Sequence, residues 1–283
     1  MASTYRQAVA HGWLPDQHGS WPIALVPPLV GIVLGGPAWP HLLLVGTWMC
    51  CFFLFNATTL WLKSSRRRRY RAATLFWLGL TVVGAATLVI LHVSVLAWVP
   101  VFLPFVALAL YEMWRGRSRS TISRLTTVLT SCLMTPVAYD LGANTGRMET
   151  WWPWQDHTDI TAHAGWGHVW LVTLALTLYF VGTIPATRVL FRRRGDARWF
   201  RLSVAYHAVA LGIVAAIVAA GAISWPVLVV FALILARNIV LPRMQAKRLA
   251  AGAGGGAGGG LPVMLIGLTE TAQCLAVAVT VLL

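Results

Sequence analysis

The stretch from His41 to Leu62 constrains the fold of this chain more than any other. Its 22 residues contain one strongly polar side chain, Asn56. A helix rises about 1.5 Å per residue, so a helix of this length crosses the roughly 30 Å hydrocarbon core of a bilayer. Six Lys and Arg follow directly, between Lys63 and Arg71. Because short basic loops are retained in the cytoplasm, the sequence predicts a transmembrane helix and also its direction.

Composition extends this prediction to the whole chain. The 283 residues are 58% hydrophobic and only 11% charged, with 15 Trp, which indicates a polytopic membrane protein rather than a soluble one. The net charge of +14 comes from short loops between apolar stretches, where membrane topology and anionic headgroups account for it, so nucleic acid is not an expected partner. The four cysteines lie in apolar stretches without CxxC spacing and are expected to be core residues.

We expect an all-α bundle of nine transmembrane helices in a single integral membrane domain, 1–283, with a cytoplasmic N-terminus. The expected spans are approximately 21–36, 41–62, 73–93, 95–114, 125–141, 166–186, 202–223, 226–241 and 261–283. Between them we expect a cytoplasmic N-terminal segment (1–21), an extracytoplasmic Trp-rich loop (142–165) and a cytoplasmic Gly-rich linker (249–260). This topology places every Lys and Arg except Arg147 on the cytoplasmic side, as the positive-inside rule requires.

Polar side chains at membrane depth are candidates for function, because they are costly unless they are paired or line a cavity. Glu270 and His207 are the candidate proton acceptors. The candidate ligand-binding residues gather toward the cytoplasmic end of the expected spans: His18, Trp21, Asn56, Lys63, Glu112, Arg188, Arg237 and Asn238. Together they predict a cytoplasm-facing cavity with an excess of cations. In the structural alternative, Lys63 and Arg188 extend to the interface, and Glu270 pairs with Arg237 to join the last two spans.

Several histidines lie near the opposite boundary. Neutral imidazoles there could bind haem or a transition metal. However, no two of them share a helix with paired spacing, so this site is not favoured. The residues are His41, His92, His163 and His168, with His157 in the loop.

Six short motifs resemble the YwiC-like family of bacterial membrane proteins, which implies a multi-pass location in the bacterial cell membrane. The resemblance extends over nearly the whole chain except the Gly tract and the Trp-rich loop. The motifs are Pro15–Trp21, Trp61–Lys63, Leu178–Thr183, Tyr206–Ala208, Leu241–Arg243 and Ile266–Glu270.

A more distant resemblance is to the UbiA superfamily of intramembrane prenyltransferases. It implies nine spans, a cytoplasmic N-terminus and an active site that opens to the cytoplasm. Those enzymes hold Mg²⁺ on a prenyl diphosphate with several aspartates. Here the matching stretch, Asn56–Ser64, keeps the Asn and has no Asp. Mg²⁺ is therefore not favoured, and no cofactor is assigned.

Three functions remain open on these residues. The first is binding of an anionic amphipathic lipid or isoprenoid, with Lys63, Arg188 and Arg237 at the headgroup. The second is a UbiA-like transferase for a lipid or quinone-like substrate, with Glu270 or His207 accepting a proton. The third is a small-solute or ion transporter, although no inverted repeat supports it.

Overall fold

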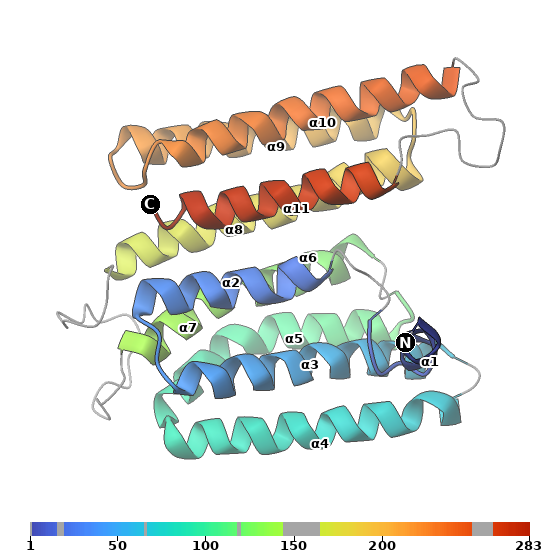
Figure 1. The fold of residues 1–283 in the computed structure, drawn as a ribbon, viewed down its shortest axis with the longest axis vertical. Coiled ribbons are helices and arrows are strands. Elements are labelled where there is room, and N and C mark those ends of the chain that lie inside the picture. The colour runs from blue at the N-terminus through green and yellow to red at the C-terminus, as the bar shows by residue number, and fades with distance from the viewer. Residues whose placement is uncertain (1, 16–19, 65–66, 118–119, 144–164, 251–262) are drawn as a thin grey trace. The chain divides into compact units, whose positions relative to one another are not determined.

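The computed structural model describes residues 2–15, 20–64, 67–117, 120–143, 165–250 and 263–283, and their regular structure is entirely helical. The chain folds into two compact units, Met1–Val169 and Trp170–Leu283. Figure 1 shows the helices of each unit. The first unit contains α1 (Ala2–Ala10), α2 (Ser20–Gly35), α3 (Pro40–Lys63), α4 (Arg67–Leu91), the 3₁₀ helix η1 (Val93–Trp98), α5 (Val99–Trp114), α6 (Thr121–Cys132) and α7 (Met134–Ala143). The second contains most of α8 (Trp166–Thr187), the π-helix η2 (Arg188–Arg192), α9 (Ala197–Ala219), α10 (Pro226–Ala250) and α11 (Val263–Thr280).

Six helical segments of the described residues are long and apolar enough to cross a membrane. They comprise α3, α4, η1 with α5, α8 with η2, α9 and α10. The helices α2 and α11 are apolar but shorter. These segments indicate an all-α, multi-pass membrane protein, and each stretch predicted to span the membrane is largely helical where it is described.

The sequence predicts the fifth span as one helix that begins at Leu125, but the structure has two helices there. They are α6 and α7, which meet at Leu133. Pro136 has no backbone N–H for the carbonyl of Cys132, and its ring crowds that carbonyl, which favours the break between α6 and α7. At its other end α6 begins earlier than predicted, because the Ser120 hydroxyl accepts a hydrogen bond from the Ser123 N–H at 3.0 Å and caps the helix.

Helix α2 contains Pro27 and Pro28, and side chains of neighbouring helices replace the backbone hydrogen bonds that these prolines remove. Proline lacks an N–H, so Pro27 and Pro28 leave the carbonyls four residues earlier, at Ile23 and Ala24, without their helical donors. The Ser131 hydroxyl donates to Ile23 O, and the Trp48 indole N–H donates to Ala24 O at 2.8 Å. The prolines therefore couple α2 to α6 and α3, as lipid-embedded backbone requires.

Helices α2 and α7 approach closely through small residues. A Cβ placed on Gly35 would lie 2.6 Å from the carbonyl oxygen of Tyr139. The Thr135 hydroxyl also donates to Pro27 O at 3.0 Å across the same contact. Small residues and short hydroxyl side chains are the usual means of tight helix packing in membranes.

The second unit is built from α8, η2, α9, α10 and α11. The Asp196 carboxylate caps α9 by accepting from the backbone N–H groups of Arg198 and Trp199 at 3.0 and 3.3 Å. Helix α10 packs against both α9 and α11. Leu190, Leu241 and Ile266 form a buried apolar cluster. This packing brings polar residues of four helices together.

Candidate functional site

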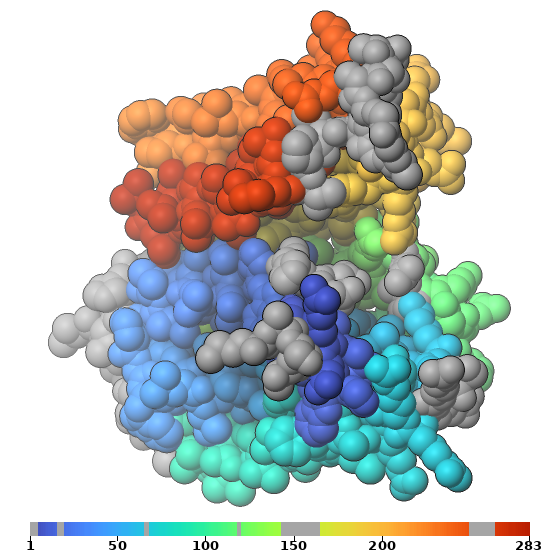
Figure 2. Space-filling view, turned by 45° about the vertical axis from the view of Figure 1, so that its right-hand side comes forward, coloured from blue at the N-terminus to red at the C-terminus, as the bar shows by residue number. Residues whose placement is uncertain are grey.

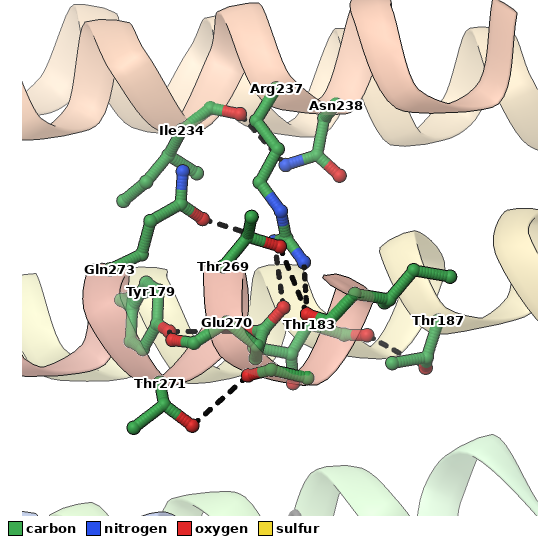
Figure 3. A network of polar contacts seen from close by, with 12 residues as sticks. Tyr179, Thr183, Thr187, Ile234, Arg237, Asn238, Thr269, Glu270, Thr271 and Gln273 are labelled. Carbon is green, nitrogen blue, oxygen red and sulfur yellow. Dashed lines mark hydrogen bonds and ion pairs between the residues drawn. The ribbon is translucent and has the colours of Figure 1, made fainter. Parts of the chain in front are cut away.

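An ion pair between α10 and α11 forms the centre of the site. Arg237 Nη1 lies 2.7 Å from Glu270 Oε2, and Figure 3 shows the two side chains between the helices. The Arg237 side chain is 9% exposed and that of Glu270 is 27% exposed. The pair that the sequence offered as a structural alternative is therefore present, with its carboxylate the more accessible partner.

The Arg237 guanidinium has further partners on α11. Its Nη1 donates to Gln273 Oε1 at 3.0 Å, and its Nη2 donates to Ile266 O at 3.4 Å. Its Nε–H is buried and has no acceptor within the described part of the chain. A planar guanidinium with one unused donor can still bind a further oxygen atom.

Tyr179 on α8 reaches the carboxylate from a third helix. Its hydroxyl lies 3.2 Å from Glu270 Oε1 and 3.1 Å from Glu270 O. A hydroxyl has one proton to donate, so these two acceptors share it. Sequence analysis had assigned no role to Tyr179 or Gln273. Their positions in the sequence could have identified both residues. Gln273 lies three residues after Glu270 and therefore on the same helical face. Tyr179 lies within one of the family motifs.

His207 and Asn238 form a second polar contact, between α9 and α10. His207 Nδ1 lies 2.7 Å from Ser203 O. Since a carbonyl can only accept, Nδ1 carries the proton and Nε2 is the acceptor. Asn238 Nδ2 donates to His207 Nε2 at 3.2 Å and to Ile234 O at 2.9 Å. His207 and Asn238 are both about 5% exposed, so this contact ties the two helices together beside the ion pair.

The site as a whole contains one cation, one anion and several neutral polar groups. An anionic ligand would have to compete with Glu270 for the guanidinium, or contact the guanidinium's remaining Nε–H. In a low-dielectric interior such contacts are strong, and a buried charge without a partner is costly. The arrangement can therefore hold an anionic group or exchange a proton at Glu270.

Comparison with known proteins places residues 14–139 within the model of the family described as YwiC-like protein. This part of the chain, somewhat less than half of its length, is similar to that family. The chain is 26% identical over 195 residues to "Uncharacterized protein YwiC" of Bacillus subtilis, an alignment that covers 69% of this chain and 73% of the relative. An "Uncharacterized protein" of Haemophilus influenzae is 24% identical over 194 residues, with 69% and 74% covered. No solved structure matches the chain.

The residues matched by the family model lie in the first unit, whereas the Arg237 network lies in the second. Of the residues that the sequence predicts to line one cavity, some belong to the first unit and some to the second. Glu270, His207, Arg237 and Asn238 come together in the second unit. Arg188 belongs to the same unit, with its guanidinium 4.7 Å from the ring centre of Trp199.

The other predicted ligand-binding residues belong to the first unit. Trp21 packs against Phe53 with ring centres 5.6 Å apart, and Lys63 is the last residue of α3. Asn56 also lies on α3, seven residues before Lys63. His18 is outside the described residues.

Glu112 has polar partners close to it in the sequence. Its buried carboxylate accepts from Arg117 Nη2 at 3.0 Å and from Ser120 Oγ at 2.7 Å. Ser120 is also the cap of α6. Glu112 therefore fixes the connection between α5 and α6.

His41 is also held by the fold, with both ring nitrogens in use. Its Nδ1 accepts from Ala38 N at 2.9 Å, and its Nε2 donates to Ala138 O at 2.8 Å. Binding of haem or a metal at this residue would require one of these hydrogen bonds to break. His157 and His163 are outside the described residues, and the described part of the chain contains no group of three or more His, Cys, Asp or Glu placed to hold a metal.

Proposed function

We propose that this membrane protein binds the anionic headgroup of an amphipathic lipid or isoprenoid at Arg237. The proposal rests on the burial and the hydrogen bonding of the Arg237 guanidinium. The group lies among apolar helices, 9% exposed, and keeps a buried Nε–H for which the described residues supply no acceptor. A phosphate oxygen suits that donor, because guanidinium groups bind phosphate with directed, charge-assisted hydrogen bonds.

Glu270 is the internal counter-ion in this proposal. It neutralises Arg237 while the site is empty and is the more accessible member of the pair. An entering anion shares or replaces this carboxylate. Tyr179 then offers its hydroxyl to the displaced carboxylate or to the backbone carbonyl that it already contacts.

Charge balance adds a second element to the proposal. Arg237 and Glu270 are neutral together, so an added anion leaves the buried network with a net negative charge. Glu270 therefore opposes the headgroup, and removal of its charge is expected to strengthen binding.

Lipid retention measured by native mass spectrometry tests the proposal. Detergent-purified protein is exposed to phosphatidylglycerol, which is anionic, and to phosphatidylcholine, which has no net charge. We expect preference for phosphatidylglycerol, loss of that preference in Arg237→Gln, and increased retention in Glu270→Gln, which removes the competing charge. Arg243→Gln is the matched control, because Arg243 lies on the same helix, is exposed and contacts Phe200 instead. Equal retention by the Arg237 and Arg243 variants would contradict the proposal.

A lipid-modifying transferase is the second candidate. The contact that favours it is the one between Tyr179 and Glu270, because a carboxylate held by a phenol is a usable proton acceptor. His207 suits this role less well, since its Nε2 accepts from Asn238. Glu270→Gln separates the two candidates. It abolishes turnover of a transferase, whereas headgroup binding persists.

A further inference from the structure

A cluster of aromatic side chains occupies the first unit, where the second half of α3 packs against the first half of α4. Trp77 on α4 lies 4.7 Å, centre to centre, from Phe53 on α3. Trp13, which follows α1, lies 5.3 Å from Phe76. The cluster comprises Trp13, Trp21, Phe52, Phe53, Phe76 and Trp77. The cluster belongs to the first unit, whereas the Arg237 network belongs to the second.

The chain after α1 folds onto this helix pair. Gly12 has a φ of +80°, and a Cβ at this position would lie 2.9 Å from Tyr70 Cδ1 and 3.4 Å from Leu60 Cδ1. Only glycine tolerates both the backbone conformation and this close approach. Figure 1 shows α1 beside the end of α3 that carries Lys63, and Figure 2 shows the N-terminal segment lying against the first part of α4. The segment thus covers one side of the cluster.

Two hydrogen-bond donors within this region are buried and lack acceptors. They are the side-chain amide Nδ2 of Asn56 and the indole Nε1 of Trp77, and nothing in the described ranges accepts from either. Asn56 follows Phe53 by three residues and precedes Leu60 by four, so these three side chains share the helix face that meets Trp77 and Gly12. An unmade hydrogen bond is costly in a lipid-embedded helix, where water does not replace the missing partner.

A part-buried indole of the same unit, that of Trp48, has an acceptor. Trp48 Nε1, on the same helix as Asn56, donates to Ala24 O at 2.8 Å. The first unit therefore provides an acceptor for one indole, and the described residues provide none for Trp77 or Asn56. An acceptor supplied by another molecule would complete both groups.

We propose that Asn56 and Trp77 form a second binding site, which takes the carbonyl oxygens of an amphipathic lipid. A carbonyl is a pure acceptor, so it matches two N–H donors. The aromatic rings supply apolar surface for the attached chain. Arg68 and Arg71, exposed at the start of α4, favour a lipid with an anionic headgroup. The acyl esters of an anionic phospholipid meet these requirements, and the ring carbonyls of a quinone present the same acceptors.

Three probes test whether the site needs carbonyl groups and whether a lipid ester or a quinone supplies them. They are ester-linked phosphatidylglycerol, its ether-linked analogue without carbonyls, and decylubiquinone. Native mass spectrometry of the detergent-purified full chain measures retention of each. Two hydrogen bonds of ordinary net strength correspond to about tenfold in affinity. We therefore expect about tenfold stronger retention of the ester lipid than of the ether lipid.

Two substitutions remove the donors while keeping the packing. Trp77→Phe keeps an aromatic ring without the N–H, and Asn56→Leu keeps a side chain of similar size. Each should reduce the ester-to-ether ratio severalfold, and Trp77→Phe should not lower the melting temperature of lipid-free protein, because it deletes a donor without a partner. Trp48→Phe is the matched control. It should leave the ratio unchanged and lower the melting temperature, since Ala24 O loses its donor.

The outcomes separate this site from the one at Arg237. Arg237→Gln should leave the ester-to-ether ratio unchanged while it removes the preference for anionic headgroups. Retention of decylubiquinone that depends on Asn56 and Trp77 would support the carbonyl site with a quinone as its ligand. Equal retention of ester and ether lipids without such quinone binding, or a ratio that survives both substitutions, would overturn the proposal and leave water as the partner of these donors.

Discussion

Gly182 on α8 lies directly against the imidazole of His207 on α9. A Cβ placed on Gly182 would be 2.8 Å from His207 Nε2 and 3.0 Å from Tyr206 Cε1. The same Nε2 accepts the hydrogen bond from Asn238. The absence of a side chain at residue 182 therefore allows three helices, α8, α9 and α10, to meet at one histidine nitrogen.

Gly182→Ala should destabilise the second unit by about 1–3 kcal/mol, the usual cost of forcing an extra carbon into a packed interior. The added carbon displaces His207 and weakens its contact with Asn238. Thermal unfolding in detergent measures the effect. Gly212→Ala is the control, because a Cβ at Gly212 would meet no atom of the described structure within 4 Å. Alanine there should be neutral or stabilising by up to about 1 kcal/mol. Equal melting temperatures for the two variants would argue against the contact.

The Arg237–Glu270 pair should behave as a coupled unit. Arg237→Met or Glu270→Leu alone leaves one charge without its partner and should cost about 3 kcal/mol or more. The double variant removes both charges, so it should be more stable than the sum of the single effects implies. Melting temperatures of the four proteins give the coupling energy. Additive single effects would mean that the two side chains do not interact, and would also weaken the case for Glu270 as the counter-ion of an anion site.

Ser120 and Arg117 contact the same buried carboxylate but should differ in importance. Ser120→Ala removes the cap of α6 and a donor to Glu112, and should cost about 1–2 kcal/mol. Arg117 is 54% exposed, so Arg117→Ala should cost less than about 1 kcal/mol. Chemical or thermal unfolding of the two variants provides the comparison. If Arg117→Ala proved the more damaging, Glu112 would depend on its charge partner and not on the helix cap.

The topology of the second unit can be tested by labelling single cysteines in protein whose native cysteines have been replaced. The cytoplasmic N-terminus predicts that Arg194, before α9, faces the cytoplasm and that Ala220, after α9, faces outward. Both positions are exposed. A membrane-impermeant maleimide added to intact cells should label Ala220→Cys and spare Arg194→Cys. Labelling of Arg194→Cys alone would reverse the predicted orientation.

Much of the fold could be predicted from the sequence, because a bilayer constrains each continuous apolar stretch of the chain separately. A run such as His41–Leu62 has to be helical in lipid, whatever its neighbours are, since only internal hydrogen bonds satisfy its backbone. The same reasoning identifies buried Glu and Arg as costly, and so it marked Glu270 and Arg237 as candidates and allowed them to pair. The Pro136 break was less predictable, because proline within a membrane helix can bend the helix or interrupt it.

Which polar side chains share a site depended on the tertiary structure. The sequence placed Asn56, Glu112 and Arg237 in one cavity because all lie toward the same predicted end of their helices. The structure shows the Glu112 carboxylate bound within a local turn, and places Asn56 in the first unit and Arg237 in the second. Depth along a helix can be read from hydropathy, but the direction a side chain faces and the partner it meets depend on how helices pack. For that reason the roles of Tyr179, as a neighbour of Glu270, and of Trp77, as a donor for which the described residues supply no acceptor, emerge only from the structure.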